Sequence, residues 1–541
     1  MKRNLKKVLT LVLSAVMLLT CFAGCGNSGG AEDDTSKPYE IVFVYPGDPA
    51  NDMDVVLEEF YARTKDTLNV TLSFIYAGWD DIGQKVSLKI SGDEKMDSAF
   101  LAQWTSPSIQ DAAMDGQLMN LDKYFNNDEY PGLKAAFSEE YLSTNKFLGD
   151  DGEYHVYGIP FSNSFGNATY VFYRKDLADK YNITVNSVDD LEGFYDAVLA
   201  NDKGMVPLAF LGSQDQLMSA FYNETKTVHN YITAGNSNAG LLAGGVIIKD
   251  DGTAYVSRTF VAADAPEFNK YMPDDDRSKT EPHWEYGVAR RFYEKGYVSE
   301  DILNTTDARA DFMAGKAASF LGSTDIYSSI ATEFSESLPD EELGMVRVTN
   351  LDEPHQIGTT FQAWNFACIP VTCKNPDRVM KFYDWVFSSQ ANNDLFELGV
   401  EGVHWNAVGD NGYEAITNPA TGNNYNFSGY LMTWNPTLTR QSASTPEIIL
   451  SDIEKCTDQT YFYKEIASGF SFDSSTVKTE AALISDVVSM KTALGNGMVA
   501  DYDAAIAELD QKLLAAGWEA YAAEYERQFN EYLKDHPYEG Q

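Results

Sequence analysis

The stretch YEIVFVYPGDPANDMDVVLEEFYART (residues 39–64) reads as a strand, a turn and a helix. Residues 41–44 are a continuous apolar run, as strands buried on both faces of a sheet are. Residues 70–104, VTLSFIYAGWDDIGQKVSLKISGDEKMDSAFLAQW, repeat this order with a strand, a helix and a short strand. Strands that alternate with helices predict a layered α/β fold with a mostly parallel sheet.

Three later stretches extend this prediction. Residues 154–183 read as extended chain ending in a helix, and residues 247–257 as a hairpin with Asp251-Gly252 at its turn. Residues 286–303 are helical up to Gly296. The end of the chain predicts a helix with an aromatic stripe, which we assign to core packing: Trp518, Tyr521, Tyr525, Phe529 and Tyr532.

The charge and length of the chain exclude some functions. It has 81 acidic and 40 basic residues, a net charge of −41, and such a field repels nucleic acid and anionic lipid surfaces. We interpret the acidity as a solubilising surface and expect no nucleic-acid partner. A hydrophobic content of 44% predicts a globular protein, and its length predicts more than one lobe.

The first 24 residues have the pattern of a secretory signal. Four cations precede a segment, residues 8–24, that carries no charge and is too short for a stable membrane span. The segment ends in Phe22-Ala23-Gly24-Cys25, which resembles the bacterial lipobox, and the resemblance implies that Cys25 carries a lipid. Residues 25–38 then read as a flexible linker that tethers a body outside the cell. The alternative is an ordinary signal with an incidental cysteine.

The remaining cysteines do not predict a metal site or a disulfide framework. Cys368, Cys373 and Cys456 are odd in number, so at least one thiol is unpaired. The six histidines lack metal-ligand spacing. We therefore expect no metal and no cofactor.

Four segments, in order, resemble one known family: YGIPFSNSFGNATYVFYRKDLADKYNI (157–183), DFMAGKAASFLGS (311–323), NPDRVMKFYDWVFSSQANNDLFELGVEGVHW (375–405) and LLAAGWEAYAAEYERQFNEYL (513–533). The family is the extracellular solute-binding proteins of ABC importers, in the maltose-binding-protein-like group. The best match is to its larger oligosaccharide-binding lipoproteins, which include alginate-oligosaccharide receptors.

This resemblance implies two α/β lobes with a hinge and a ligand cleft between them, plus C-terminal helices. It assigns residues 39–158 and 303–356 to the first lobe and residues 159–302 and 357–541 to the second. It also implies a monomeric, lipid-anchored receptor on the outer face of the cytoplasmic membrane. Its partners would be an oligosaccharide and the permease subunits of an importer. Residues 201–210 lack the acidic calcium loop of some larger members.

Flat aromatic rings suit the apolar face of a sugar, and planar amides and carboxylates suit its hydroxyl rim. A sugar site therefore pairs tryptophan or tyrosine with polar side chains on loops at strand ends. We assign Trp385 and Trp518 to the core, while core packing remains open for each of the other tryptophans. The candidate ligand-binding residues are Tyr45, Trp79, Asp80, Asp81, Gln103, Trp104, Asn163, Ser164, Trp284, Tyr286, Trp364, Asn365, Glu401 and Trp405.

Two other functions stay open on the sequence. A receptor for another solute, such as a peptide, has the same architecture. A secreted glycoside hydrolase needs two carboxylates across a cleft, and 81 acidic residues always offer a pair. No local catalytic signature supports the hydrolase, so we expect no enzyme activity.

Overall fold

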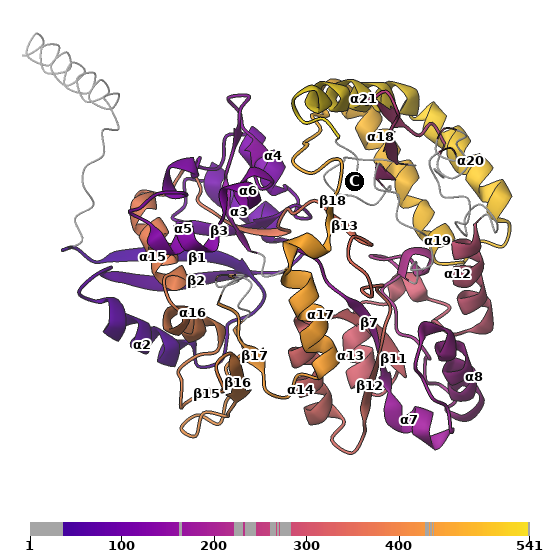
Figure 1. Cartoon of the computed structure of the whole chain (residues 1–541), viewed down its shortest axis with the longest axis horizontal. Coiled ribbons are helices and arrows are strands. Elements are labelled where there is room, and N and C mark those ends of the chain that lie inside the picture. The colour runs from indigo at the N-terminus through magenta and orange to yellow at the C-terminus, as the bar shows by residue number, and fades with distance from the viewer. Residues whose placement is uncertain are drawn as a thin grey trace, which may run out of the picture.

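The computed structural model contains two α/β lobes and a helical C-terminal unit. Figure 1 shows the first lobe on the left, the second at the lower right and the C-terminal helices at the upper right. Cys25, Asn163 and Ser164 lie outside the described residues. The structure describes residues 36–161, 165–220, 231–232, 245–259, 267, 270, 283–427, 432, 435 and 438–538.

The first lobe is built on a five-stranded sheet in the order β2-β1-β3-β14-β6. β1 runs parallel to β2 and β3, and β14 runs antiparallel to β3 and β6. The apolar run of residues 41–44 is buried inside β1, as predicted. The prediction of a mostly parallel sheet holds for β1, β2 and β3 only, because the pairings of β14 are antiparallel. The strands are β1 (Tyr39–Pro46), β2 (Val70–Ala77), β3 (Ser98–Ala102), β6 (Gly158–Phe161) and β14 (Asn365–Cys368).

Helices from distant parts of the chain cover this sheet. Pro376 and the Asn375 side chain, which accepts from the backbone N–H of Arg378, begin α15. α15 packs on α5 so closely that a Cβ on Gly132 would lie 2.2 Å from the carbonyl oxygen of Asp384. The helices are α2 (Met53–Thr64), α3 (Ile82–Ser91), α4 (Ile109–Met114), α5 (Pro131–Ala136), α6 (Glu139–Ser143), α15 (Pro376–Phe387) and α16 (Gln390–Glu397).

The second lobe is built on a smaller, antiparallel sheet in the order β11-β7-β12. Helices pack on both faces, and α17 lies where the two lobes meet (Figure 1). The strands are β7 (Thr169–Arg174), β11 (Ser319–Ser323) and β12 (Leu343–Arg347). The helices are α7 (Lys175–Lys180), α8 (Leu191–Asn201), α9 (Leu217–Ala220), α12 (Trp284–Lys295), α13 (Ala308–Met313), α14 (Tyr327–Ser337) and α17 (Glu447–Thr457).

This topology corrects the predicted lobe boundaries. Residues 303–356 belong to the second lobe rather than the first, because β11 and β12 flank β7. The first part of 357–541 returns to the first lobe, because β14 pairs with β3 and β6 and α15 joins the same apolar core. The α/β architecture with two lobes is confirmed, while the assignment of these two segments is wrong.

The C-terminal unit packs helices on the predicted hairpin. β9 and β10 pair antiparallel around Gly252, whose φ of +78° suits the turn. Four rings of the aromatic stripe of α21 are buried and Tyr532 is partly buried, and the helix packs on this hairpin and α18, as the periodicity predicts. The elements are β8 (Tyr231–Ile232), β9 (Val246–Ile248), β10 (Ala254–Val256), α18 (Lys478–Ser489), α19 (Lys491–Gly495), α20 (Tyr502–Ala515) and α21 (Trp518–Asp535).

Short strands form small sheets where the lobes and the C-terminal unit meet. Tyr413 of β16 and Ser328 of α14 line the same cavity, and burial raises the pKa of Tyr413. Cys368, Cys373 and Cys456 are all free and buried. The short strands are β4 (Phe147–Leu148), β5 (Tyr154–His155), β13 (Gly358–Thr359), β15 (Trp405–Val408), β16 (Gly412–Ala415), β17 (Gln441–Ser442) and β18 (Tyr463–Lys464).

Candidate functional site

Three tryptophans are exposed at one edge of the first sheet. β2 ends at Ala77 and β3 ends at Ala102, so Trp79 and Trp104 both follow carboxyl ends of parallel strands. Their ring centroids lie 6.1 Å apart. The exposed fractions are 40% for Trp79, 45% for Trp104 and 59% for Trp364. Ligands of open α/β sheets bind beyond this edge, so we call Trp79, Trp104 and Trp364 the tryptophan platform.

Hydrogen bonds hold the platform in place. The backbone N–H of Gln103 donates to the carbonyl of Trp364 at 3.2 Å, and its side-chain amide donates to the carbonyl of Ala363 at 2.7 Å. The indole Nε1 of Trp104 donates to Oδ1 of Asn365 at 3.1 Å. The chain thus brings together five of the predicted site residues, although residues 103 and 365 are far apart in sequence.

The buried side of the platform is also aromatic. Phe100 lies beneath it, with its ring centroid 6.1 Å from Trp79 and 6.0 Å from Trp104. These contacts orient the indoles without covering them, because both remain more than a third exposed. The platform is therefore a supported, solvent-facing apolar surface of the kind that suits a flat ligand face.

Two predicted carboxylates adjoin the platform. Asp80 and Asp81 directly follow Trp79 and are exposed, and Asp81 occupies the N-cap position of α3. The Nζ of Lys85, one turn into α3, donates to the carbonyl of Tyr76 at 2.7 Å. The carboxylates are therefore accessible hydrogen-bond acceptors beside an exposed indole.

A polar cavity of about 250 Å³ lies between the two lobes. It joins the start of α14 and one side of α17 to β16 and to the segment around Arg440. The guanidinium of Arg440 is already engaged, with Nε 2.8 Å from Oδ2 of Asp394 and Nη1 donating to the carbonyl of Asp410 at 3.0 Å. The polar and aromatic side chains that line the cavity include Asn167, Thr324, Asp325, Tyr327, Ser328, Glu397, Tyr413, Gln441 and Thr445.

No local pattern in the sequence predicts this cavity, because its lining comes from six separate segments of the chain. Ser328 and Tyr413 belong to different lobes, and neither segment alone indicates that these two side chains meet. The cavity offers hydroxyls, carboxylates and two tyrosine rings, which is a second polar surface between the lobes.

Two predicted site residues lie in the protein core instead. Tyr45 is fully buried, and its hydroxyl lies 3.3 Å from that of Tyr383, because the last residues of β1 are covered on both faces. Trp405 is 3% exposed, and its Nε1 donates to the carbonyl of Gly399 at 3.0 Å. The expectation that these two rings face a ligand is wrong.

The remaining candidates lie apart from the platform's contacts. Trp284 and Tyr286 belong to α12 and are each only 8% exposed, and the Tyr286 ring centroid lies 4.5 Å from that of Tyr502. They are therefore not available as open stacking surfaces in this structure. Glu401 is exposed, and its backbone pairs with that of Trp405.

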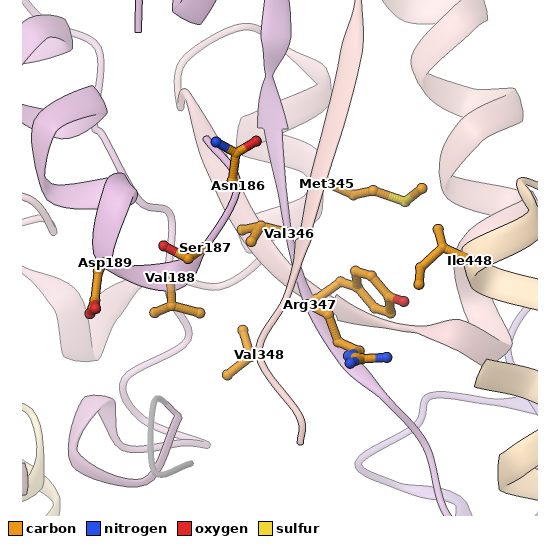
Figure 2. A pocket seen from close by; sticks show the side chains of 10 residues that line it. Asn186, Ser187, Val188, Asp189, Met345, Val346, Arg347, Val348 and Ile448 are labelled. Atoms are coloured by element: carbon orange, nitrogen blue, oxygen red, sulfur yellow. The ribbon is translucent and has the colours of Figure 1, made fainter. Parts of the chain in front are cut away.

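A larger cavity of about 530 Å³ lies on the second lobe, away from the tryptophans. It straddles β12: Figure 2 shows Met345 and Arg347 pointing to the side of Ile448, and Val346 and Val348 to the side of Ser187. Nη1 of Arg347 is 2.9 Å from Oδ1 of the buried Asp452. The guanidinium that lines this cavity is therefore already paired with a buried carboxylate.

The described ranges contain neither a metal-binding cluster nor a membrane-spanning helix. Within them, no group of three or more His, Cys, Asp or Glu side chains is placed to hold a metal ion. Nor does any helix of these ranges have the length and apolarity that a membrane crossing requires.

The geometry agrees with a family match. A family model described as bacterial extracellular solute-binding protein matches residues 57–403, which span both lobes and the whole tryptophan platform. The chain belongs to this family. A second model, described as a domain of unknown function, matches residues 466–534 of this solute-binding protein, the C-terminal helical unit.

Several known proteins resemble this solute-binding protein over nearly their full length. A carbohydrate ABC transporter substrate-binding protein of Streptococcus pneumoniae is 24% identical, with 98% of this chain and 99% of that protein covered. Two solved structures share the fold. The N-glycan transport solute binding protein of Streptococcus pneumoniae is 20% identical, covering 92% of this chain and 100% of its own, with a TM-score of 0.67. The alginate-binding protein AlgQ2 is 17% identical, covering 92% and 99%, with a TM-score of 0.58.

Proposed function

We propose that this solute-binding protein captures an oligosaccharide outside the cell and delivers it to the permease of an ABC importer. The observation that carries the proposal is the tryptophan platform, where three exposed indoles meet the amides of Gln103 and Asn365. The relative described as a carbohydrate ABC transporter substrate-binding protein supports both the ligand class and the importer.

The platform matches the chemistry of a sugar ring. One face of a pyranose presents C–H groups that pack on an indole, while its rim presents hydroxyls that need donors and acceptors. Trp79 and Trp104 supply two neighbouring rings, 6.1 Å apart, which favours a ligand of more than one sugar. Asp80 and Asp81 supply acceptors at the rim.

The second lobe completes the site when the lobes close. The polar cavity already draws its lining from both lobes, with Ser328 on one side and Tyr413 on the other. A ligand that contacts both lobes favours the closed arrangement by its additional contacts there. We place the oligosaccharide on the platform, and we expect closure to add contacts from the second lobe.

The function is tested by a binding screen followed by a chemical one. A glycan array set beside a peptide panel should yield oligosaccharides as the ligands, with affinities confirmed by calorimetry. Incubation of bound oligosaccharides with the protein should release no new reducing ends, because we propose a receptor and not a hydrolase. Peptide ligands alone, or steady release of reducing ends, would overturn the proposal.

We also propose that Cys25 anchors the protein to the outer face of the membrane. Replacing Cys25 with serine should abolish incorporation of a labelled lipid precursor, because serine lacks the thiol that the lipid modifies. The protein should then appear in the medium or keep its signal. A diacylglyceryl group supplies two chains, and each buried CH₂ contributes about 0.8 kcal/mol, which is enough for stable anchoring. Labelled lipid that is still incorporated into the Cys25→Ser variant would contradict the proposed anchor.

Binding should not depend on a metal ion. The segment 201–210 lacks an acidic calcium loop, so excess EDTA should change the affinity for the oligosaccharide less than about twofold, or about 0.4 kcal/mol. Calorimetry with and without the chelator measures this directly. A large loss of affinity that added calcium restores would contradict the expectation.

A further inference from the structure

We infer that the site selects uncharged oligosaccharides and rejects those that carry carboxylates, such as oligouronates. This inference rests on the proposed function and specifies its substrate class. The observations behind it are the exposed carboxylates that follow Trp79, the carboxylate of Asp325 in the lining of the polar cavity, and the partners that Lys85 and Arg440 already have.

Two carboxylates adjoin the platform. Asp80 and Asp81 are exposed immediately after Trp79. The Nζ of Lys85 is 2.7 Å from the carbonyl oxygen of Tyr76, so this ammonium is directed to the end of β2. These three residues together carry a net charge of −1.

The polar cavity repeats this pattern. Asp325 and Glu397 line it from opposite lobes. Arg440 is the lining cation, and its Nε lies 2.8 Å from Oδ2 of Asp394, with side chains only 14% and 5% exposed. Recognition of a carboxylate usually relies on an arginine fork with free N–H groups. Here Nη1 of the same guanidinium also donates to the carbonyl of Asp410, so both Nε and Nη1 already have partners within the protein.

Carboxylates in these positions suit hydroxyl groups. An ionised aspartate or glutamate only accepts hydrogen bonds, and every sugar hydroxyl has a proton to donate. Replacing one hydroxymethyl group of the sugar by a carboxylate removes that donor and adds a like charge. The added like charge should lower the affinity at least tenfold at low salt, or by at least about 1.4 kcal/mol.

The test compares matched neutral and acidic probes. Oligomers of glucose, mannose or N-acetylglucosamine, two to six units long, are titrated beside mannuronate, guluronate and galacturonate oligomers of the same lengths. We expect the best neutral probe to bind at least tenfold more tightly than any acidic probe at low salt. The ratio of neutral-probe to acidic-probe affinity should fall as salt is raised, because exposed charges are screened beyond about 10 Å at 0.1 M.

Charge variants separate local repulsion from the field of the whole chain. The double variant Asp80→Asn, Asp81→Asn should improve binding of the acidic probes at least threefold. The matched control Glu58→Gln, Asp66→Asn removes the same charge from two exposed positions, one in α2 and one just after it. This control should leave the ratio of neutral-probe to acidic-probe affinity unchanged. Equal gains in both double variants would overturn the assignment to Asp80 and Asp81.

The remaining outcomes distinguish this inference from the proposed function. If an acidic probe binds more tightly than every neutral one and loses affinity in Trp104→Ala, the charge inference is wrong and the oligosaccharide receptor stands. If no neutral or acidic oligosaccharide binds, the proposed function is wrong, and the inference falls with it.

Discussion

Replacing Trp104 with alanine should weaken binding of the cognate oligosaccharide about 30- to 150-fold. Burial of a large aromatic side chain contributes about 2–3 kcal/mol, and 1.4 kcal/mol corresponds to a factor of ten. The change also removes the neighbour that supports Trp79, whose ring centroid lies 6.1 Å away. Calorimetric titration of parent and variant measures the loss.

Two controls make this result specific. Trp104→Phe keeps an aromatic ring and loses the Nε1 hydrogen bond to Asn365, which is worth about 1 kcal/mol, so affinity should fall only about fivefold. Trp284→Phe changes a buried ring of α12 and should alter stability with little change in affinity. A loss of less than about threefold for Trp104→Ala, or about 0.7 kcal/mol, would show that the platform is not the binding surface.

Replacing Asp52 with asparagine should destabilise the first lobe by about 2–3 kcal/mol, because hydrogen bonds to a charged acceptor are worth about that much. The carboxylate accepts from the side chains of Asn418, Thr421 and Asn423, at 2.6 to 2.8 Å, and so ties α2 to a distant loop. Asparagine tolerates the φ of +55° at this position, so the backbone is not the cause. Urea unfolding measures the difference.

The loss of stability in Asp52→Asn should become smaller as the pH falls. Hydrogen bonds, from Asn423 first and then Thr421, lower the pKa of Asp52 from 3.8 to about 2. A carboxylate whose pKa is lowered on folding stabilises the protein above its unfolded pKa, and this stabilisation disappears as the pH falls from about 4 to 2. Parent and Asp52→Asn should therefore converge in acid.

Asp54→Asn is the matched control for Asp52. It changes an exposed carboxylate in the first turn of the same helix, where the helix dipole is worth less than about 1 kcal/mol. If Asp52→Asn is no more destabilising than Asp54→Asn at neutral pH, the network around Asp52 does not hold the loop.

Local patterns predicted individual elements well. The apolar run 41–44 became a fully buried strand, and Gly296 ends α12 with a φ of +74°. The aromatic stripe from Trp518 onward packs in the C-terminal core. Each of these features depends on periodicity or on one residue with special backbone freedom, so neighbouring residues are sufficient to identify it.

The assignment of segments to lobes failed for a physical reason. A short strand such as SFLGS (319–323) has a pattern that suits either sheet, and its partner is chosen by long-range pairing with β7. Strands β12 and β14 present the same ambiguity, and they join different sheets. Nothing in a single segment encodes which distant strand it will meet.

The candidate site was predicted in part for a similar reason. Trp79 and Trp104 follow strand ends and are exposed, as their positions suggest, whereas Tyr45 also ends a strand and is buried under Tyr383. The exposure of an aromatic ring depends on what covers it from elsewhere in the chain. The polar cavity around Tyr413 was missed because its lining residues meet only in the folded protein.

A crystal structure of the protein with a bound oligosaccharide, chosen from the glycan array, tests the central claim most directly. The account predicts a sugar ring in van der Waals contact with Trp104 or Trp79, with hydroxyls hydrogen-bonded to Gln103, Asp80 or Asp81. A well-ordered oligosaccharide bound elsewhere, such as in the cavity beside Met345 and Ile448, with all three platform tryptophans still in solvent, would contradict it.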